Sequence, residues 1–231
     1  MHPGQLWDLP QRLSRAVHEF VFDPGLHLHA QRAAHLLPEG LSVPRFRTGS
    51  RTLMERCGLS PHVELEFDQP LHRMALLPAD ALALVARRAS WTWHVADLQR
   101  VVLKTEVEAL TSQLQLAPQD WEALNEQAPA MASNTQELPR TPRLSLDVLT
   151  TRIPSVGWQL IDAACQALPD SVASRIRLKL PVWGHQEVMD HSPRDLSVMV
   201  AKAYEWAVAQ WDPQWERLWT EALAVPLRRR A

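Results

Sequence analysis

Proline is frequent in this chain and glycine is rare. The 231 residues include 18 prolines and only 7 glycines. Proline starts or ends helices, because it lacks an amide hydrogen and its ring clashes with the preceding turn. Scarce glycine disfavours tight β turns and the loops that hold phosphates. The ratio therefore predicts short helices joined by stiff corners.

Apolar residues recur mostly at helical spacing between these breaks. Asp8 is a candidate N-cap for the first helix, Gly58 a candidate C-terminal stop, and Ser192 an N-cap followed by Pro193. We expect helices over residues 7–20, 26–37, 48–57, 79–93, 95–116, 118–127, 145–167 and 192–211, with a restart at 213.

One segment, residues 62–68, alternates instead. Its sequence HVELEFD places Val63, Leu65 and Phe67 on one side and the acidic residues on the other. A single strand has no obvious partner here, so we expect an extended segment lying across helices. The prediction is an all-α fold in a single compact multi-helix domain over residues 1–231. The proline-rich stretch 128–144 is the candidate flexible loop or hinge.

Composition narrows the classes of function. The net charge of −2 at pH 7 gives no general attraction to nucleic acid or to an anionic membrane. Cys57 and Cys165 stand alone, which fits a reducing compartment. No stretch is long and apolar enough for a cleaved signal or a membrane span. We expect a cytoplasmic, soluble protein that binds no nucleic acid and does not insert into the membrane.

Histidine is concentrated in two segments with metal-ligand residue types. The first, HLHAQRAAHLLP, holds three histidines, but on a helix positions i and i+2 point in different directions and no further ligand completes a set. The second, HQEVMDH, lacks the spacing of known zinc motifs. We therefore expect no metal and no cofactor, and keep a metal-dependent enzyme as an alternative. The residues concerned are His27, His29 and His35, and His185, Glu187, Asp190 and His191.

No pattern for nucleophilic catalysis or nucleotide binding is present, so no catalytic residue is predicted. Tryptophans gather near the C-terminus at positions 206, 211, 215 and 219. Packing in the core is their first interpretation. The other interpretation is that Trp215 and Trp219, four residues apart on one helix face, contact a protein partner.

Several stretches, in order along the chain, resemble the SctK (YscK/PscK) family of type III secretion systems. Residues 19–38 resemble its N-terminal part, with Phe20, Phe22 and Pro24 before a histidine at 27 or 29 and a Leu36-Leu37 pair. Residues 76–124 are similar to its central helices, and RIRLKLP at 175–181 resembles a basic-apolar segment near its C-terminal part.

This resemblance implies a non-enzymatic cytoplasmic adaptor of the sorting platform. Such an adaptor links the cytosolic domain of the SctD-type inner-ring protein to the SctQ-type pod protein, which holds SctL and the SctN ATPase. We expect its contacts to use exposed aromatic and leucine side chains. A helical regulatory or chaperone-like module unrelated to secretion is the second alternative.

Overall fold

The computed structural model describes residues 10–36, 47–101, 103–114, 120–122, 145–182 and 192–224. Across these residues the chain forms helices and no strand, which confirms the all-α prediction. The elements are α1 (Gln11–Phe22), the 3-10 turn η2 (Pro24–His27), α2 (Ala30–Leu36), α3 (Arg47–Arg56), α4 (Pro70–Met74), α5 (Ala79–Trp93), α6 (Val95–Leu98), α7 (Lys104–Leu114), α9 (Leu146–Ala164), η3 (Cys165–Ala167), α10 (Asp170–Lys179), α11 (Pro193–Trp211) and α12 (Pro213–Ala224).

Proline marks the starts of many of these helices, as expected. Prolines precede α1, α5 and α10, and a proline is the first residue of α4, α11 and α12. Their fixed φ suits the first helical turn, where an amide hydrogen has no partner. Pro154 is an exception, because α9 continues through it.

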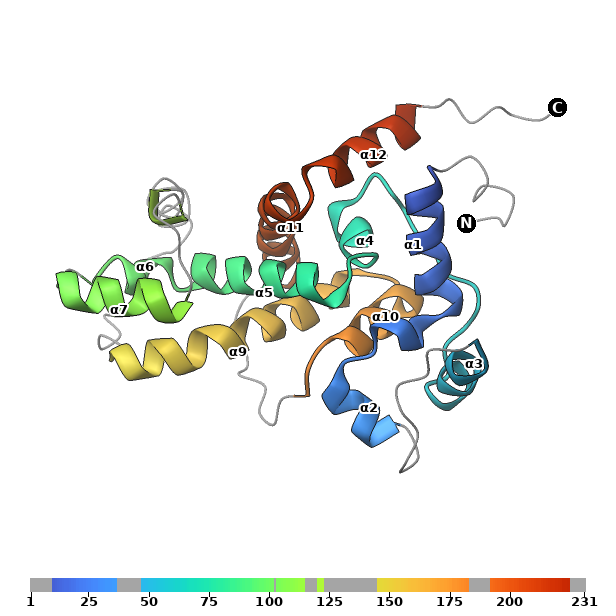
Figure 1. The fold of residues 1–231 in the computed structure, drawn as a ribbon, viewed down its shortest axis with the longest axis horizontal. Helices are drawn as coiled ribbons and strands as arrows, with labels where there is room; N and C mark the ends of the chain where they lie inside the picture. The colour runs from blue at the N-terminus through green and yellow to red at the C-terminus, as the bar shows by residue number, and fades with distance from the viewer. Residues whose placement is uncertain are drawn as a thin grey trace.

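Three helices, α5, α9 and α11, form the centre of the molecule (Figure 1). Figure 1 shows α5 and α9 lying side by side, with α6 and α7 at one end and α1, α2, α3 and α10 at the other. Gly157 allows the close approach of α9 to α5, because a Cβ there would overlap the backbone of Ala86. Ser90 of α5 donates a hydrogen bond to the carbonyl oxygen of Ile153 in α9.

The buried apolar side chains fall into three clusters. The largest runs from α1 to α12 and includes Leu13, Val17 and Phe20 of α1. A second lies where α5, α6 and α7 meet the first half of α9. The smallest lies under α2 and α3. The molecule therefore has one main core, with the second cluster towards the α6–α7 end and the smallest cluster towards the α2–α3 end.

Residues 62–66 form no helix and lead into a turn at 67–68, and the predicted alternation of buried and exposed side chains is confirmed. Val63 and Leu65 belong to the main core, whereas Glu64 and Glu66 are exposed. The ring of Phe67 lies 4.8 Å from that of Trp219. The segment forms no strand and crosses the helices as a single chain, so burial of its apolar side maintains the period of two.

Two expected helices are divided in the structure: the one over 26–37 into η2 and α2, and the one over 95–116 into α6 and α7. After Leu98 the chain makes tight turns, in which Arg100 and Val101 donate to the carbonyl oxygens of Asp97 and Leu98. The break lets α7 turn back so that Leu110 and Leu114 join the second cluster on α9. Tertiary packing overrides a continuous helical pattern here.

Helix ends follow the local signals in the described residues. Ser192 Oγ accepts a hydrogen bond from the amide of Asp195 at 3.2 Å, so the predicted cap is confirmed. Gly58 follows α3 with φ of 62°, as expected for a C-terminal stop. The first helix begins at Gln11 rather than at residue 7. Asp8 and the stretch 128–144 lie outside the described residues, and the division into domains stays a prediction.

Candidate functional site

The structure does not bring the three histidines of the first segment together as one group of ligands. His27 ends η2, His29 precedes α2, and His35 is exposed in the last turn of α2. Nδ1 of His29 accepts a hydrogen bond from the backbone of Gln31 instead. The described residues contain no group of three or more histidine, cysteine, aspartate or glutamate side chains placed to hold a metal ion. His185, Glu187, Asp190 and His191 lie outside the described residues.

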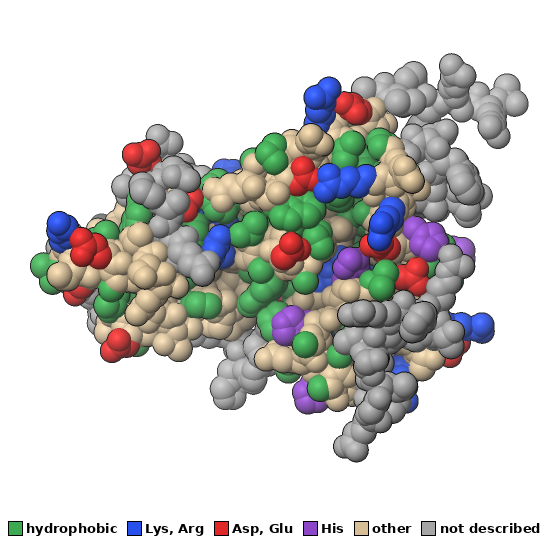
Figure 2. Space-filling view, in the orientation of Figure 1, with side chains coloured by type: hydrophobic (Ala, Val, Ile, Leu, Met, Phe, Trp, Pro, Cys, Tyr) green, Lys and Arg blue, Asp and Glu red, His purple; other side chains and the backbone are tan. Residues whose placement is uncertain are grey.

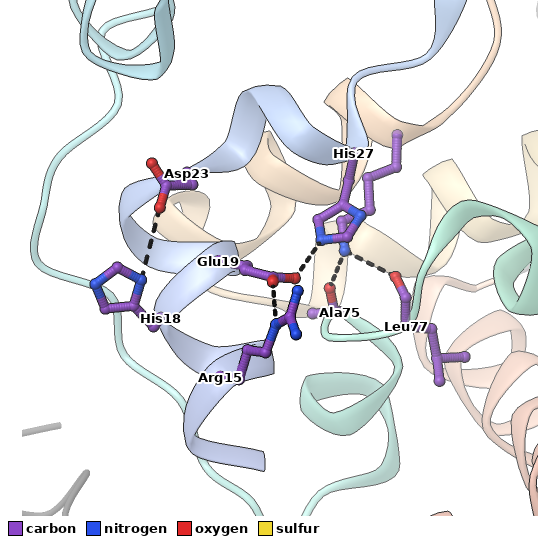
Figure 3. A network of polar contacts seen from close by, with 8 residues as sticks. Arg15, His18, Glu19, Asp23, His27, Ala75 and Leu77 are labelled. Atoms are coloured by element: carbon purple, nitrogen blue, oxygen red, sulfur yellow. Dashed lines mark hydrogen bonds and ion pairs between the residues drawn. The ribbon is translucent and has the colours of Figure 1, made fainter. Parts of the chain in front are cut away.

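His27 instead pairs with Glu19 of α1 (Figure 3). Its Nε2 atom lies 3.3 Å from Oε2 of Glu19, and the other carboxylate oxygen of Glu19 accepts from Nε of Arg15 at 2.7 Å. Burial, assisted by the charge of Lys179, lowers the pKa of His27 to about 4. The imidazole is therefore neutral at physiological pH.

Lys179, the last residue of α10, is buried, and its charge acts on His27. Its Nζ atom donates to the carbonyl oxygens of Ala75 and Leu77, each at 2.8 Å, in the turn between α4 and α5. Burial lowers its pKa to about 7, against a weaker opposing effect of Glu19. The amine thus ties α10 to the α4–α5 turn through backbone acceptors.

Arg175 lies one helical turn before Lys179 and is also buried. Its guanidinium donates to the carbonyl oxygens of Phe20, Val21 and Ser60. Burial lowers its pKa to about 10. These carbonyls belong to the end of α1 and to the chain just before the extended segment, so one side chain holds two distant parts of the chain on α10.

The sequence interpretation missed both cations, although a signal for them was present. RIRLKLP was noted only as a family-like segment. Within it, Arg175 and Lys179 are spaced i, i+4 on the same face as the buried Val172. Two basic residues in register with an apolar stripe indicate buried cations that bind backbone oxygens.

Two of the four C-terminal tryptophans, Trp215 and Trp219, lie in the core, and Trp206 and Trp211 are partly buried against it. Trp215 and Trp219 are 2% and 0% exposed, so neither presents a surface to a partner in this conformation. Their rings make an edge-to-face pair at 5.9 Å, and Trp215 makes another with Trp211 at 5.7 Å. The guanidinium of Arg12 lies over the rings of Trp211 and Trp215. Core packing describes both side chains.

A polar group holds α12 beside these rings. Oε2 of Glu216 lies 2.6 Å from Nη1 of Arg73, and Oε1 accepts a hydrogen bond from the hydroxyl of Tyr204 at 2.5 Å. Burial and the Glu216 carboxylate raise the pKa of Tyr204 above its ordinary value. Glu216 therefore connects α12 to both α4 and α11.

Exposed apolar side chains are spread over several elements. Figure 2 shows hydrophobic side chains interspersed with acidic and basic ones across the face in view. Large side chains that are more than two-fifths exposed lie at both ends of the molecule and on α11 and α12. They are Phe22, Leu26, Leu103, Val148, Val182, Val198 and Leu223.

The buried charges described above bind backbone oxygens and one another, so their role is to hold helices together. Together with the apolar clusters, they define an all-helical fold held by buried polar contacts. The chain belongs to the YscK family, described as YOP proteins translocation protein K, whose model matches residues 15–224, and it is thus a type III secretion protein. No curated protein and no solved structure gave a significant match. Within the described residues, no helix has the length and apolar character needed to cross a membrane.

Proposed function

We propose that this protein is a non-enzymatic adaptor on the cytoplasmic side of a type III secretion system. It links the cytosolic domain of the SctD-type inner-membrane ring protein to the SctQ-type pod protein, and through it to SctL and the SctN ATPase. Family membership over residues 15–224 is the observation that carries this proposal. The all-helical fold is compatible with a scaffold of this kind.

The family match also favours this role over the two alternatives. The described residues contain no group of ligands that would support a metal-dependent enzyme. Among them, His27 pairs with Glu19, and His29 accepts a hydrogen bond from the backbone of Gln31. A regulatory or chaperone-like module outside secretion is disfavoured by the secretion family itself. The adaptor role is therefore the function that we carry forward.

Exposed apolar side chains are the proposed partner contacts. Phe22 and Leu26 flank the turn between α1 and η2, and they are 44% and 43% exposed. Leu103 at the start of α7 and Leu223 near the end of α12 are 56% and 52% exposed. Large apolar side chains of this kind supply binding energy when a partner covers them. Trp215 and Trp219 can contact a partner only if α12 moves away from the core.

A binding experiment tests the proposal and its surface. The full chain is immobilised and offered the SctQ-type protein and the SctD-type cytosolic domain of the same system separately. We expect both to be retained, and failure to retain either one contradicts the adaptor role. Phe22→Glu, Leu103→Glu and Leu223→Glu are tested singly, and at least one should reduce retention of one partner about tenfold or more.

The matched controls also introduce a glutamate at an exposed position, but they replace an arginine rather than a large apolar side chain. Arg51 and Arg217 are 84% and 79% exposed, and each pairs with a glutamate one turn along its own helix. Arg51→Glu and Arg217→Glu should leave retention of both partners unchanged. Loss of binding in these controls as well would assign the effect to net charge rather than to an apolar contact.

A further inference from the structure

Four elements meet around Glu19, His27 and Lys179: α1, η2, α10 and the turn between α4 and α5 (Figure 3). We propose that these three side chains form an acid-sensitive latch, which holds the corner of α1 and η2 against α10 and the α4–α5 turn and releases that corner as the pH falls. The latch does not depend on which partners the protein binds.

The carboxylate of Glu19 lies between two basic side chains, His27 and Arg15. Glu19 binds His27 on its inner side and Arg15 on its outer side, where the Arg15 side chain is 80% exposed. His27 is 19% exposed, and the Nζ atom of the buried Lys179 lies 5.3 Å from the centre of the Phe20 ring. The imidazole of His27 thus lies between the Glu19 carboxylate and the buried amine of Lys179, whose charge opposes its protonation.

The charges that act on His27 come from three helices. Lys179 of α10 opposes its protonation, whereas Glu19 of α1 and Asp80 of α5 favour it. On α3, which also packs against η2, Arg51 and Glu55 pair with each other at an exposed site. Desolvation is the largest effect on His27, so a second buried positive charge beside Lys179 is unfavourable.

The direction of the response follows from linkage. The closed corner holds the pKa of His27 near 4, whereas an opened corner returns the imidazole to water and to its ordinary value of 6.5. The contribution of His27 to closure is complete above pH 6.5 and is lost as the pH falls towards 4. Lys179 responds in the same direction, but between 10.5 and about 7, so His27 is the responding group in mild acid.

Hydrogen exchange on the full chain between pH 7.5 and pH 5 tests the latch, after correction for intrinsic exchange. We expect the opening equilibrium of residues 11–27 to rise by roughly 30-fold through His27 and by a further factor of about four through Lys179, while α5 changes far less. His27→Gln should reduce this response to the roughly fourfold change that Lys179 contributes. Equal changes in residues 11–27 and in α5, or an unchanged response in His27→Gln, overturn the proposal.

His18→Gln is the matched control. His18 lies on the same corner, but its side chain is 45% exposed and faces Asp23 at 3.6 Å, away from the buried junction (Figure 3). This variant should keep the full pH response of the parent protein. A response lost in His18→Gln and kept in His27→Gln contradicts the assignment.

A second measurement on the unmodified chain does not depend on any variant folding. The sequence has three lysines, Lys104, Lys179 and Lys202, so selective labelling gives one amine signal for each. Lys104 is 90% exposed and Lys202 is exposed, so both serve as internal references. The Lys179 signal should titrate near pH 7, well below the 10.5 of an exposed lysine amine. Titration of the Lys179 signal near 10.5 overturns the buried junction on which the latch depends.

Discussion

Gly157 of α9 lies directly against the backbone of Ala86 in α5, with no room for a Cβ between the two helices. Figure 1 shows the two helices side by side over much of their length. We expect Gly157→Ala to push these helices apart and to reduce the free energy of unfolding by about 2 kcal/mol or more. Urea unfolding measures this, and Ser155→Ala, an exposed change on the same helix, should stay within about 0.5 kcal/mol.

Trp219 is the largest apolar contribution of α12 to the core. It is fully buried, and its ring contacts those of Trp215 and Phe67. Trp219→Ala should cost about 3–5 kcal/mol, because it removes buried area and leaves a cavity. Thermal unfolding with Leu223→Ala as the control checks this, since Leu223 lies on the same helix and is 52% exposed. Similar losses in both variants would contradict the described packing.

Glu216 connects α12 to two other helices through Arg73 and Tyr204. Glu216→Gln keeps the shape of the side chain but removes the charge that the Arg73 guanidinium faces. We expect a loss of about 1–3 kcal/mol in the free energy of unfolding. Glu221→Gln removes an exposed i, i+4 pair with Arg217 on the same helix and should cost less than about 0.5 kcal/mol. Equal costs would show that the Glu216 contacts are not formed.

Lys179 should give the protein a pH-dependent stability that a variant can remove. Its pKa is about 7 in the folded state and 10.5 when exposed, so the unfolded chain binds more protons between these values. Folding stability from this residue therefore rises as the pH increases from 7 towards 10.5, with a slope of at most about 1.4 kcal/mol per pH unit. The difference between the parent chain and Lys179→Met, measured by urea unfolding at several pH values, should show this slope.

Other groups titrate in the same pH range, so the test uses the difference in stability between the parent chain and Lys179→Met. Burial raises the pKa of the Cys165 thiol to about 12, and this lowers stability as the pH rises above 9 in both proteins. The Lys179→Met curve should also lie below the parent curve at high pH, because the carbonyl oxygens of Ala75 and Leu77 lose their donor. Parallel curves for the two proteins would contradict a buried amine at this position.

Helix positions were predictable because proline and apolar periodicity act locally. Pro78 and Ser192 mark helix starts that the structure confirms, and Leu13, Val17 and Phe20 form the expected buried stripe. The division of 95–116 was not predictable, because it depends on how α7 returns to α9. A local pattern does not contain such a long-range contact.

The buried cations show the same limit at the candidate site. The spacing of Arg175 and Lys179 places them on one helix face, but their acceptors are carbonyl oxygens from positions 20, 21, 60, 75 and 77. Every residue has a carbonyl group, so side-chain motifs cannot identify these partners. His27 was noticed for its neighbours in sequence, whereas its partner Glu19 lies on another helix.

A bridging experiment tests the adaptor role most directly. The SctD-type cytosolic domain is immobilised, and the SctQ-type protein is passed over it with and without the full chain described here. The adaptor role predicts that SctQ is retained only when the chain is present, at a stoichiometry set by the amount of chain bound. Retention of SctQ without the chain, or no retention with it, would contradict the role proposed for this protein.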